Sequence, residues 1–290
     1  MKSCTTLFTT PATTRRSNGL RFILSLAALT LVPQLSLQAA QLRIERSHGV
    51  ETWETRQLLV HPQIQTIQIS EDVAYKRDMS YRAIPLGALL EGVTAQDHLQ
   101  AVATDGFAAE IPAAPVVQPK GSKAWLAIED PAHPWPALSN GSQSAGPFYL
   151  VWTAPSADNI GREEWPYAMS TLRVLASVSE RFPALLPDPT LAAEDPVNKG
   201  FALFQKNCLA CHRLNAAGDS QLGPDLNLPH SPTEYFSAGY LRQYIRNPQS
   251  LREWPQGKMP SIPKEVLSDT ELDQVIAYLE HMVARRKAGE

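Results

Sequence analysis

The residues with the most definite chemistry are two thiols and an imidazole in the run Cys208-Leu209-Ala210-Cys211-His212. Each thiol can add across one vinyl group of a haem, and the histidine that follows can bind the iron as an axial ligand. The spacing C-x-x-C-H therefore predicts covalent attachment of one haem c. The alternatives are a redox dithiol, which does not need His212, and half of a zinc site, which would need a second pair of ligands.

A second axial ligand must come from elsewhere in the same region. Met259 lies in a loop flanked by prolines, from which a thioether can approach the iron on the face opposite His212. His230, in another loop, is the rival. We expect His281 to be a solvated residue on a polar face of the last helix, and Met282 to pack in the core with the apolar face of that helix. His/Met pairs are a known arrangement in c-type haem. We therefore expect His212 and Met259 to be the iron ligands.

Three predicted helices would position these ligands. Residues 199–207 can form a short helix that leads into the motif, and residues 235–246 carry apolar side chains at helical spacing. The last helix begins at Ser268, which forms a capping box with Glu271. Its apolar face comprises Leu272, Val275, Ile276, Leu279 and Met282. The C-terminal region is therefore expected to be helical.

Residues 199 to about 285 resemble a class I cytochrome c domain, which is an all-α fold. Gly200 and Phe204 precede the thiol motif at the spacing of that family, and Met259-Pro260 is similar to its distal ligand loop. Residues 267–279 resemble its C-terminal helix. The resemblance implies that this helix crosses the N-terminal helix of the domain near Gly200 and Phe204.

The run Gly223-Pro224-Asp225-Leu226 resembles the Gly-Pro-x-Leu turn of the same family. The resemblance implies that the carbonyl oxygen of Pro224 accepts a hydrogen bond from the ring of His212. Pro224 would then fix the orientation and the basicity of the imidazole without touching the iron.

The preceding region, residues 41–180, contains no cysteine and many short apolar runs separated by turn residues. We expect one short helix over residues 85–91, with Pro85 in its first turn. Alternating or continuous apolar patterns predict strands over residues 64–69, 99–103, 124–128, 148–153 and 171–178. This region should be mixed and mostly β.

Four short runs carry a second resemblance: residues 81–86, 103–107, 126–129 and 146–152. In their order they are similar to the molybdopterin-binding domain of the sulfite oxidase family, an α+β fold, over residues 48–178. Members that bind the molybdenum cofactor supply a cysteine thiolate to the metal, and Ser or Thr does not replace that soft ligand. Because residues 41–180 have no cysteine, we expect this domain to lack molybdopterin.

The N-terminus has the pattern of a secretory signal. Arg15, Arg16 and Arg21 are followed by an apolar stretch over residues 22–35 and by small residues suited to cleavage near residue 40. The stretch is short for a membrane helix. We therefore expect a cleaved signal and a periplasmic protein, with membrane association only if the signal stays in place. The arginine pair suggests a twin-arginine signal as an alternative to general export.

Four segments follow from these patterns. They are a signal peptide over residues 1–40, a sulfite oxidase-like β-rich domain over 41–180, a proline-rich linker over 181–198 and a monohaem cytochrome c domain over 199–290. A net charge of -3 with no basic stripe argues against nucleic acid as a partner.

The expected function is transfer of single electrons, and the sequence offers no set of catalytic residues. The donor would be a periplasmic dehydrogenase and the acceptor a cytochrome or an oxidase, with the N-terminal domain as the docking module. We expect a carrier, or a subunit of an oxidoreductase complex, more than an enzyme. The alternatives are a sulfite dehydrogenase-like enzyme that passes electrons to its own haem, and a haem-based sensory or structural subunit.

Overall fold

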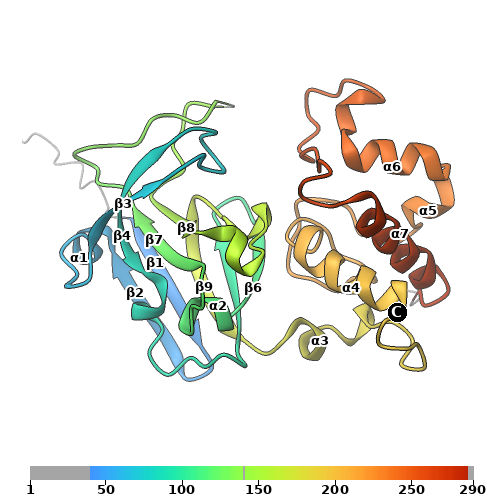
Figure 1. Ribbon diagram of the computed structural model, residues 1–290, viewed down its shortest axis with the longest axis horizontal. Helices are drawn as coiled ribbons and strands as arrows, with labels where there is room; N and C mark the ends of the chain where they lie inside the picture. Colours follow the sequence, from blue (N-terminus) through green and yellow to red (C-terminus); the bar gives the residue numbers. More distant parts are fainter. Residues whose placement is uncertain (1–39, 140, 287–290) are drawn as a thin grey trace, which may run out of the picture. The chain divides into compact units, whose positions relative to one another are not determined.

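Two β-sheets make up the first part of the computed structural model, which describes residues 40–139 and 141–286 (Figure 1). One sheet has the strand order β2-β1-β9-β5-β6, and the other has the order β3-β4-β7-β8. The strands are β1 (Gln41–Arg46), β2 (Gly49–Glu54), β3 (Gln65–Ile69), β4 (Met79–Pro85), β5 (His98–Ala103), β6 (Ala108–Pro112), β7 (Lys123–Ile128), β8 (Phe148–Thr153) and β9 (Met169–Leu175). The expected mostly-β region is confirmed.

The pairing of β1 with β9 joins the two ends of this region. These two strands run parallel, with Arg43 beside Thr171, whereas the other strand pairs are antiparallel. Strand β1 buries alternate residues, and Leu42 and Ile44 point into the core. Strands β7 and β8 are buried on both faces, which explains their nearly continuous apolar sequences.

A buried carboxylate lies within this apolar core. Asp72 is fully buried, and its Oδ1 atom accepts hydrogen bonds of 2.9 Å from the backbone N–H groups of Ala74 and Tyr75. The hydroxyl of Tyr81 donates to Oδ2 at 2.9 Å, and that of Tyr149 donates to Oδ1 at 3.3 Å. Both carboxylate oxygens therefore have partners, as a buried charge requires.

The second part of the chain is helical, as predicted. Its helices are α3 (Val178–Arg181), α4 (Pro196–Asn207), α5 (Pro232–Tyr235), α6 (Ala238–Arg246) and α7 (Asp269–Val283). Asp195 caps α4 by accepting from the Val197 N–H, and the predicted capping box of Ser268 with Glu271 starts α7. The β-rich part contains two single-turn helices, α1 (Thr55–Leu58) and α2 (Ala114–Val117).

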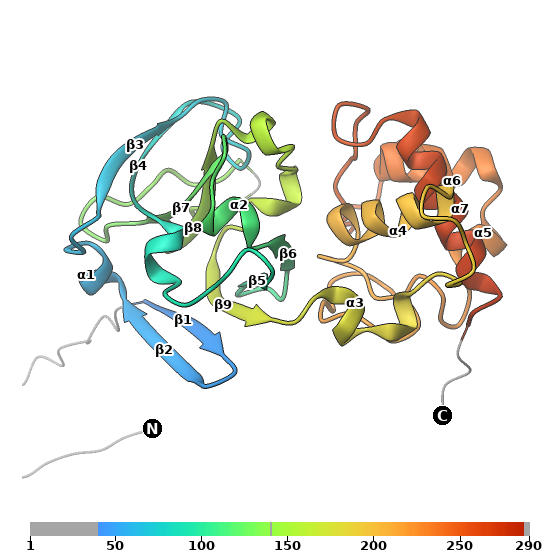
Figure 2. The same cartoon turned by 60° about the horizontal axis from the view of Figure 1, so that its bottom comes forward.

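Helices α4 and α7 pack closely against each other, which both views show (Figures 1 and 2). A Cβ atom on Gly200 would lie 2.0 Å from the carbonyl oxygen of Gln274, so only glycine permits this approach. Phe204, which is fully buried, packs on Tyr278 with ring centroids 5.3 Å apart. These are the residues near which the resemblance places the helix crossing.

Several predicted elements differ in detail from the structure. The helix expected over residues 85–91 is a 3-10 turn, Leu86–Leu89, because β4 continues through Pro85. The helix expected over 235–246 begins later, at Ala238, because Tyr235 ends α5 and Phe236 and Ser237 have an extended backbone. Strands β1, β2, β4 and β6 were not predicted.

The segment expected to be a linker, residues 181–198, also contributes to packing. Leu185 is fully buried in the helical core together with Val178, and its carbonyl oxygen accepts a hydrogen bond of 2.7 Å from the Tyr278 hydroxyl. The predicted signal peptide lies outside the described residues except for Ala40. Among the residues that the structure describes, no helix combines the length and apolar character required to cross a membrane.

Candidate functional site

The predicted haem-attachment motif begins where α4 ends. Cys208 is the C-cap residue of α4, and Cys211 follows one turn later, because the backbone N–H groups of Cys211 and His212 both bond to the Cys208 carbonyl. Both thiols are free and half-buried. The turn therefore presents two unoxidised thiols and an imidazole within five consecutive residues.

Burial determines the protonation state of these groups. It raises the pKa of Cys208 and of Cys211 to about 12, and the nearby carboxylate of Glu163 acts in the same direction. Burial also lowers the pKa of His212, although its hydrogen bond to Pro224 acts in the opposite direction. At neutral pH the protein thus carries two thiols and a neutral imidazole, which is the form of histidine that binds a metal.

The ring of His212 is held by the turn over residues 223–226. Its Nδ1 atom lies 2.9 Å from the carbonyl oxygen of Pro224, and because a carbonyl only accepts, Nδ1 must carry the proton. A Cβ atom on Gly223 would lie 2.5 Å from two atoms of the ring. Glycine therefore lets the imidazole pack on the backbone, and Nε2 is left as the ligand atom.

Asp225, the variable residue of the Gly-Pro-x-Leu turn, stabilises the turn itself. Its side chain accepts hydrogen bonds from backbone N–H groups on both sides of the turn, at Asn215, Ala216, Asn227 and Leu228. Sequence reasoning missed this role. The signal was an aspartate directly after Gly-Pro, a position from which the side chain readily caps local N–H groups.

Met259, the predicted second ligand, lies in the loop between α6 and α7. It is half-buried and packs on the helical core, as does Cys208. Arg246 secures the loop that follows, because its Nη1 atom donates to the carbonyl oxygens of Ile262 and Leu267. The structure therefore anchors the predicted distal loop at a fixed point of α6.

The rival ligands have other environments. The Nε2 atom of His281 accepts a hydrogen bond of 3.1 Å from the Asp188 N–H, and Met282 is 1% exposed within the core. His230 is exposed and lies 4.0 Å from the Glu234 carboxylate. Met259 is thus the methionine that combines partial exposure with a position beside the core, while the choice of ligand remains a prediction.

The residues present fit a covalently attached haem. Two free thiols, a neutral imidazole with Nε2 available and an anchored loop methionine are the donor set that such a group needs. A zinc site would need further ligands, and the described residues contain no cluster of three or more His, Cys, Asp or Glu side chains that could hold a metal ion.

Comparison with known proteins identifies the family that the helical part resembles. Residues 197–282 match the cytochrome c family, so this part of the chain is a cytochrome c domain, which implies a covalently bound haem c. No curated protein matches the chain.

Among solved structures, the chain is similar to the sulfane dehydrogenase SoxCD from Paracoccus pantotrophus, with a TM-score of 0.34 and 17% identity. The match covers 49% of this chain and 40% of that chain, so this chain spans less than half of its length. Similarity at this level does not assign the fold of the β-rich part.

Proposed function

We propose that the protein is an exported monohaem c-type cytochrome that carries single electrons from a periplasmic dehydrogenase to a cytochrome or an oxidase. One observation supports this most directly. The ring of His212 is fixed through Nδ1 by the Pro224 carbonyl, immediately beside two free thiols, within a segment that matches the cytochrome c family. When bound, the haem supplies an iron that alternates between the ferric and ferrous states.

The chain's own residues determine what that iron can do. Thioether bonds from Cys208 and Cys211 would keep the group in place, and His212 would bind on one face through Nε2. Met259 would bind on the other face, and a soft neutral thioether favours ferrous iron and raises the potential. With His212 and Met259 both bound, the iron would have no free position for oxygen or peroxide and would supply electron transfer alone.

The β-rich part is proposed to dock the redox partner. We propose a sulfite oxidase-like fold without molybdopterin, because residues 41–180 lack the cysteine that would bind molybdenum. Its core contains the buried group of Asp72, Tyr81 and Tyr149, whose polar atoms bond to one another. Such a group stabilises the core and is not displayed to a substrate.

The test is purification of the full-length protein from an export-competent host, followed by a pyridine haemochrome spectrum and metal analysis. We expect one c-type haem per chain, no molybdenum and no turnover of sulfite without a partner. Absence of c-type haem would overturn the proposal. Stoichiometric molybdenum, or turnover by the isolated protein, would instead support the sulfite dehydrogenase-like enzyme.

Carbon monoxide separates the carrier from the sensory alternative. If Met259 fills the sixth position, carbon monoxide should bind slowly or weakly to the ferrous protein. Rapid and complete binding would indicate an open or labile position and favour a haem-based sensor.

A further inference from the structure

The turn that carries the thiols is also held by residues from the β-rich part. The backbone N–H of Ala108, at the start of β6, donates to the carbonyl oxygen of Ala210 at 3.2 Å. Ala210 lies between the two cysteines. A second attachment lies nine residues after Ala210, at Asp219.

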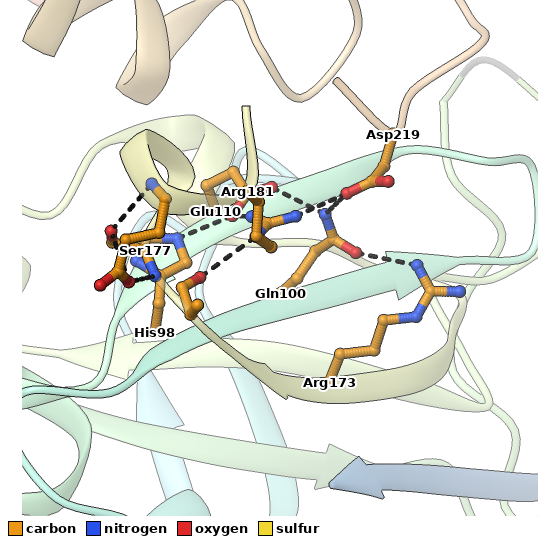
Figure 3. A network of polar contacts seen from close by, with 9 residues as sticks. His98, Gln100, Glu110, Arg173, Ser177, Arg181 and Asp219 are labelled. Carbon is orange, nitrogen blue, oxygen red and sulfur yellow. Dashed lines mark hydrogen bonds and ion pairs between the residues drawn. The ribbon is translucent and has the colours of Figure 1, made fainter. Parts of the chain in front are cut away.

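Asp219 receives two hydrogen bonds on a single carboxylate oxygen (Figure 3). The Nε2 atom of Gln100 donates to Oδ2 at 2.6 Å, and the Nη1 atom of Arg181 donates to the same oxygen at 2.7 Å. Gln100 is fully buried on β5, and the Arg181 side chain is 14% exposed. Short bonds to a charged acceptor from buried donors are the stronger kind of hydrogen bond.

The two donors are themselves fixed by other contacts (Figure 3). Gln100 accepts from Arg173 at 2.9 Å and also donates to Glu110 at 2.7 Å. Arg181 donates to the other oxygen of Glu110 at 2.7 Å. Asp219 therefore binds to a preformed polar network, and does not merely pair with mobile surface side chains.

A short stretch of chain connects Asp219 with the ring of His212. Only four residues separate Asp219 from Pro224, and the N–H of Gly223 donates to the Cys211 carbonyl at 2.8 Å. The carbonyl of Pro224 then accepts from His212. A displacement of Asp219 would therefore change the length or angle of the hydrogen bond to the imidazole.

We infer that Asp219 is a positioning residue for His212, through which the β-rich part adjusts the reduction equilibrium of the haem iron. The inference rests on the proposed function. A firm hydrogen bond from Nδ1–H makes the imidazole a stronger donor, which favours ferric iron. Loosening the turn at Asp219 should weaken that bond and shift the equilibrium toward ferrous iron.

The test is an optical redox titration of the haem-loaded, full-length protein with Asp219→Ala and Asp219→Asn. Asp219 is 36% exposed, so both variants should fold. In Asp219→Ala the ratio of ferrous to ferric protein at a given potential should rise. The rise should be less than roughly tenfold, the effect expected from losing a direct partner of a metal-binding histidine, because Asp219 acts on His212 only through the turn. Asp219→Asn, which retains an oxygen for Gln100 and Arg181, should have a smaller effect.

Charge loss alone is separated from positioning by Glu163→Gln and by proton NMR of the ferrous protein. Glu163→Gln, compared at a pH above the value of about 7 to which burial raises the Glu163 pKa, removes a charge near the thiols without touching the Asp219 contacts, and should leave exchange of the His212 Nδ1 proton unchanged. Asp219→Ala should accelerate that exchange. Unchanged exchange in Asp219→Ala, or equal potential shifts in the Ala and Asn variants, would overturn the inference.

The proposed function and the inference fail in different ways. If the native protein holds no c-type haem, the proposed function is lost before any variant is compared. If the native spectrum is that of a c-type haem and the titrations coincide, the proposed function stands and Asp219 has no positioning role.

Discussion

The β-rich part and the helical part differ in whether their buried polar groups have hydrogen-bond partners or are left free to bind a ligand. In the β-rich part the buried carboxylate of Asp72 has partners on both oxygens, supplied by hydroxyls and backbone amides of its own core. In the helical part Cys208 and Cys211 are free and half-buried beside a neutral histidine. The first arrangement stabilises a fold, and the second is prepared to react with a ligand.

This difference indicates a division of labour within one chain. The helical part carries the groups that form bonds to haem and iron, whereas the β-rich part supplies two donors, Gln100 and the backbone N–H of Ala108, that hold the segment around the thiols. If the division is correct, changes in the helical part should alter the haem, whereas changes in the core of the β-rich part, away from the Asp219 contacts, should alter only stability. The largest expected effects test this directly.

The largest effect is expected from Cys208→Ser combined with Cys211→Ser. A hydroxyl does not add to a vinyl group as a thiol does, so covalent haem should be lost completely. Haem staining after denaturing electrophoresis measures this. Cys4→Ser, in the predicted signal peptide, is the matched control and should leave haem content unchanged. Haem that still migrates with the double variant would contradict the assignment of the motif.

The second effect should be confined to stability. Asp72→Ala leaves the Tyr81 and Tyr149 hydroxyls without their buried acceptor, and should lower the free energy of unfolding by about 3–5 kcal/mol. Urea unfolding followed by tryptophan fluorescence measures the loss. Glu91→Ala, at an exposed position, is the control and should change it by less than about 0.5 kcal/mol.

A changed haem spectrum in Asp72→Ala, under conditions where the protein remains folded, would contradict this division between the two parts. Asp72 would then influence the iron as well as the β-rich core. An unchanged spectrum with lower stability would show that Asp72 acts on the β-rich core alone.

The haem-attachment motif and the turn that holds His212 could be predicted because their residues lie close together in the sequence. The two thiols and His212 lie within five residues, and the Gly-Pro turn that holds the ring follows eleven residues later. The cap at Ser268 was also predictable, since a capping box spans only four residues. Patterns of this length are complete within a short window of sequence.

Contacts between residues that lie far apart in the sequence could not be predicted from such short patterns. The bond from Gln100 to Asp219 joins residues 119 positions apart, and neither residue has a distinctive local pattern. Strand β1 was missed for a related reason, because its pairing with β9 joins opposite ends of the β-rich part. Such pairings depend on the whole fold, and local propensity carries little information about them.

The third prediction concerns Met259→Ala. Loss of the thioether should remove the low-spin methionine-ligated spectrum and lower the midpoint potential by on the order of 0.1 V, about 2.3 kcal/mol for one electron. Visible spectroscopy and redox titration measure both changes. Met282→Leu, in the core of α7, should retain the spectrum and cost less than about 1.5 kcal/mol of stability.

An unchanged spectrum in Met259→Ala would exclude Met259 as a ligand. If His230→Ala then altered the spectrum, the iron would be bound by two histidines. The division between the two parts would survive that result, because both candidates belong to the helical part.

The smallest effect is a pH dependence at Glu110, where the network that holds Asp219 is centred. Burial alone would raise the pKa of Glu110, but hydrogen bonds from His98 and Arg181 outweigh it, so the pKa lies below the ordinary glutamate value. A carboxyl whose pKa falls on folding stabilises the protein above its ordinary pKa and loses that contribution as the pH falls through the folded-state value. The network should therefore be intact at neutral pH and weaken only in acid.

Glu110→Gln tests this sign. At neutral pH the variant should be about 1–2 kcal/mol less stable than the native protein, because the three donors His98, Gln100 and Arg181 lose a charged acceptor. The difference should shrink as the pH falls below the ordinary glutamate range, since the native carboxyl is then protonated too. Urea unfolding across that range measures the difference, and a gap that stays constant would show that the charge of Glu110 does not hold the network together.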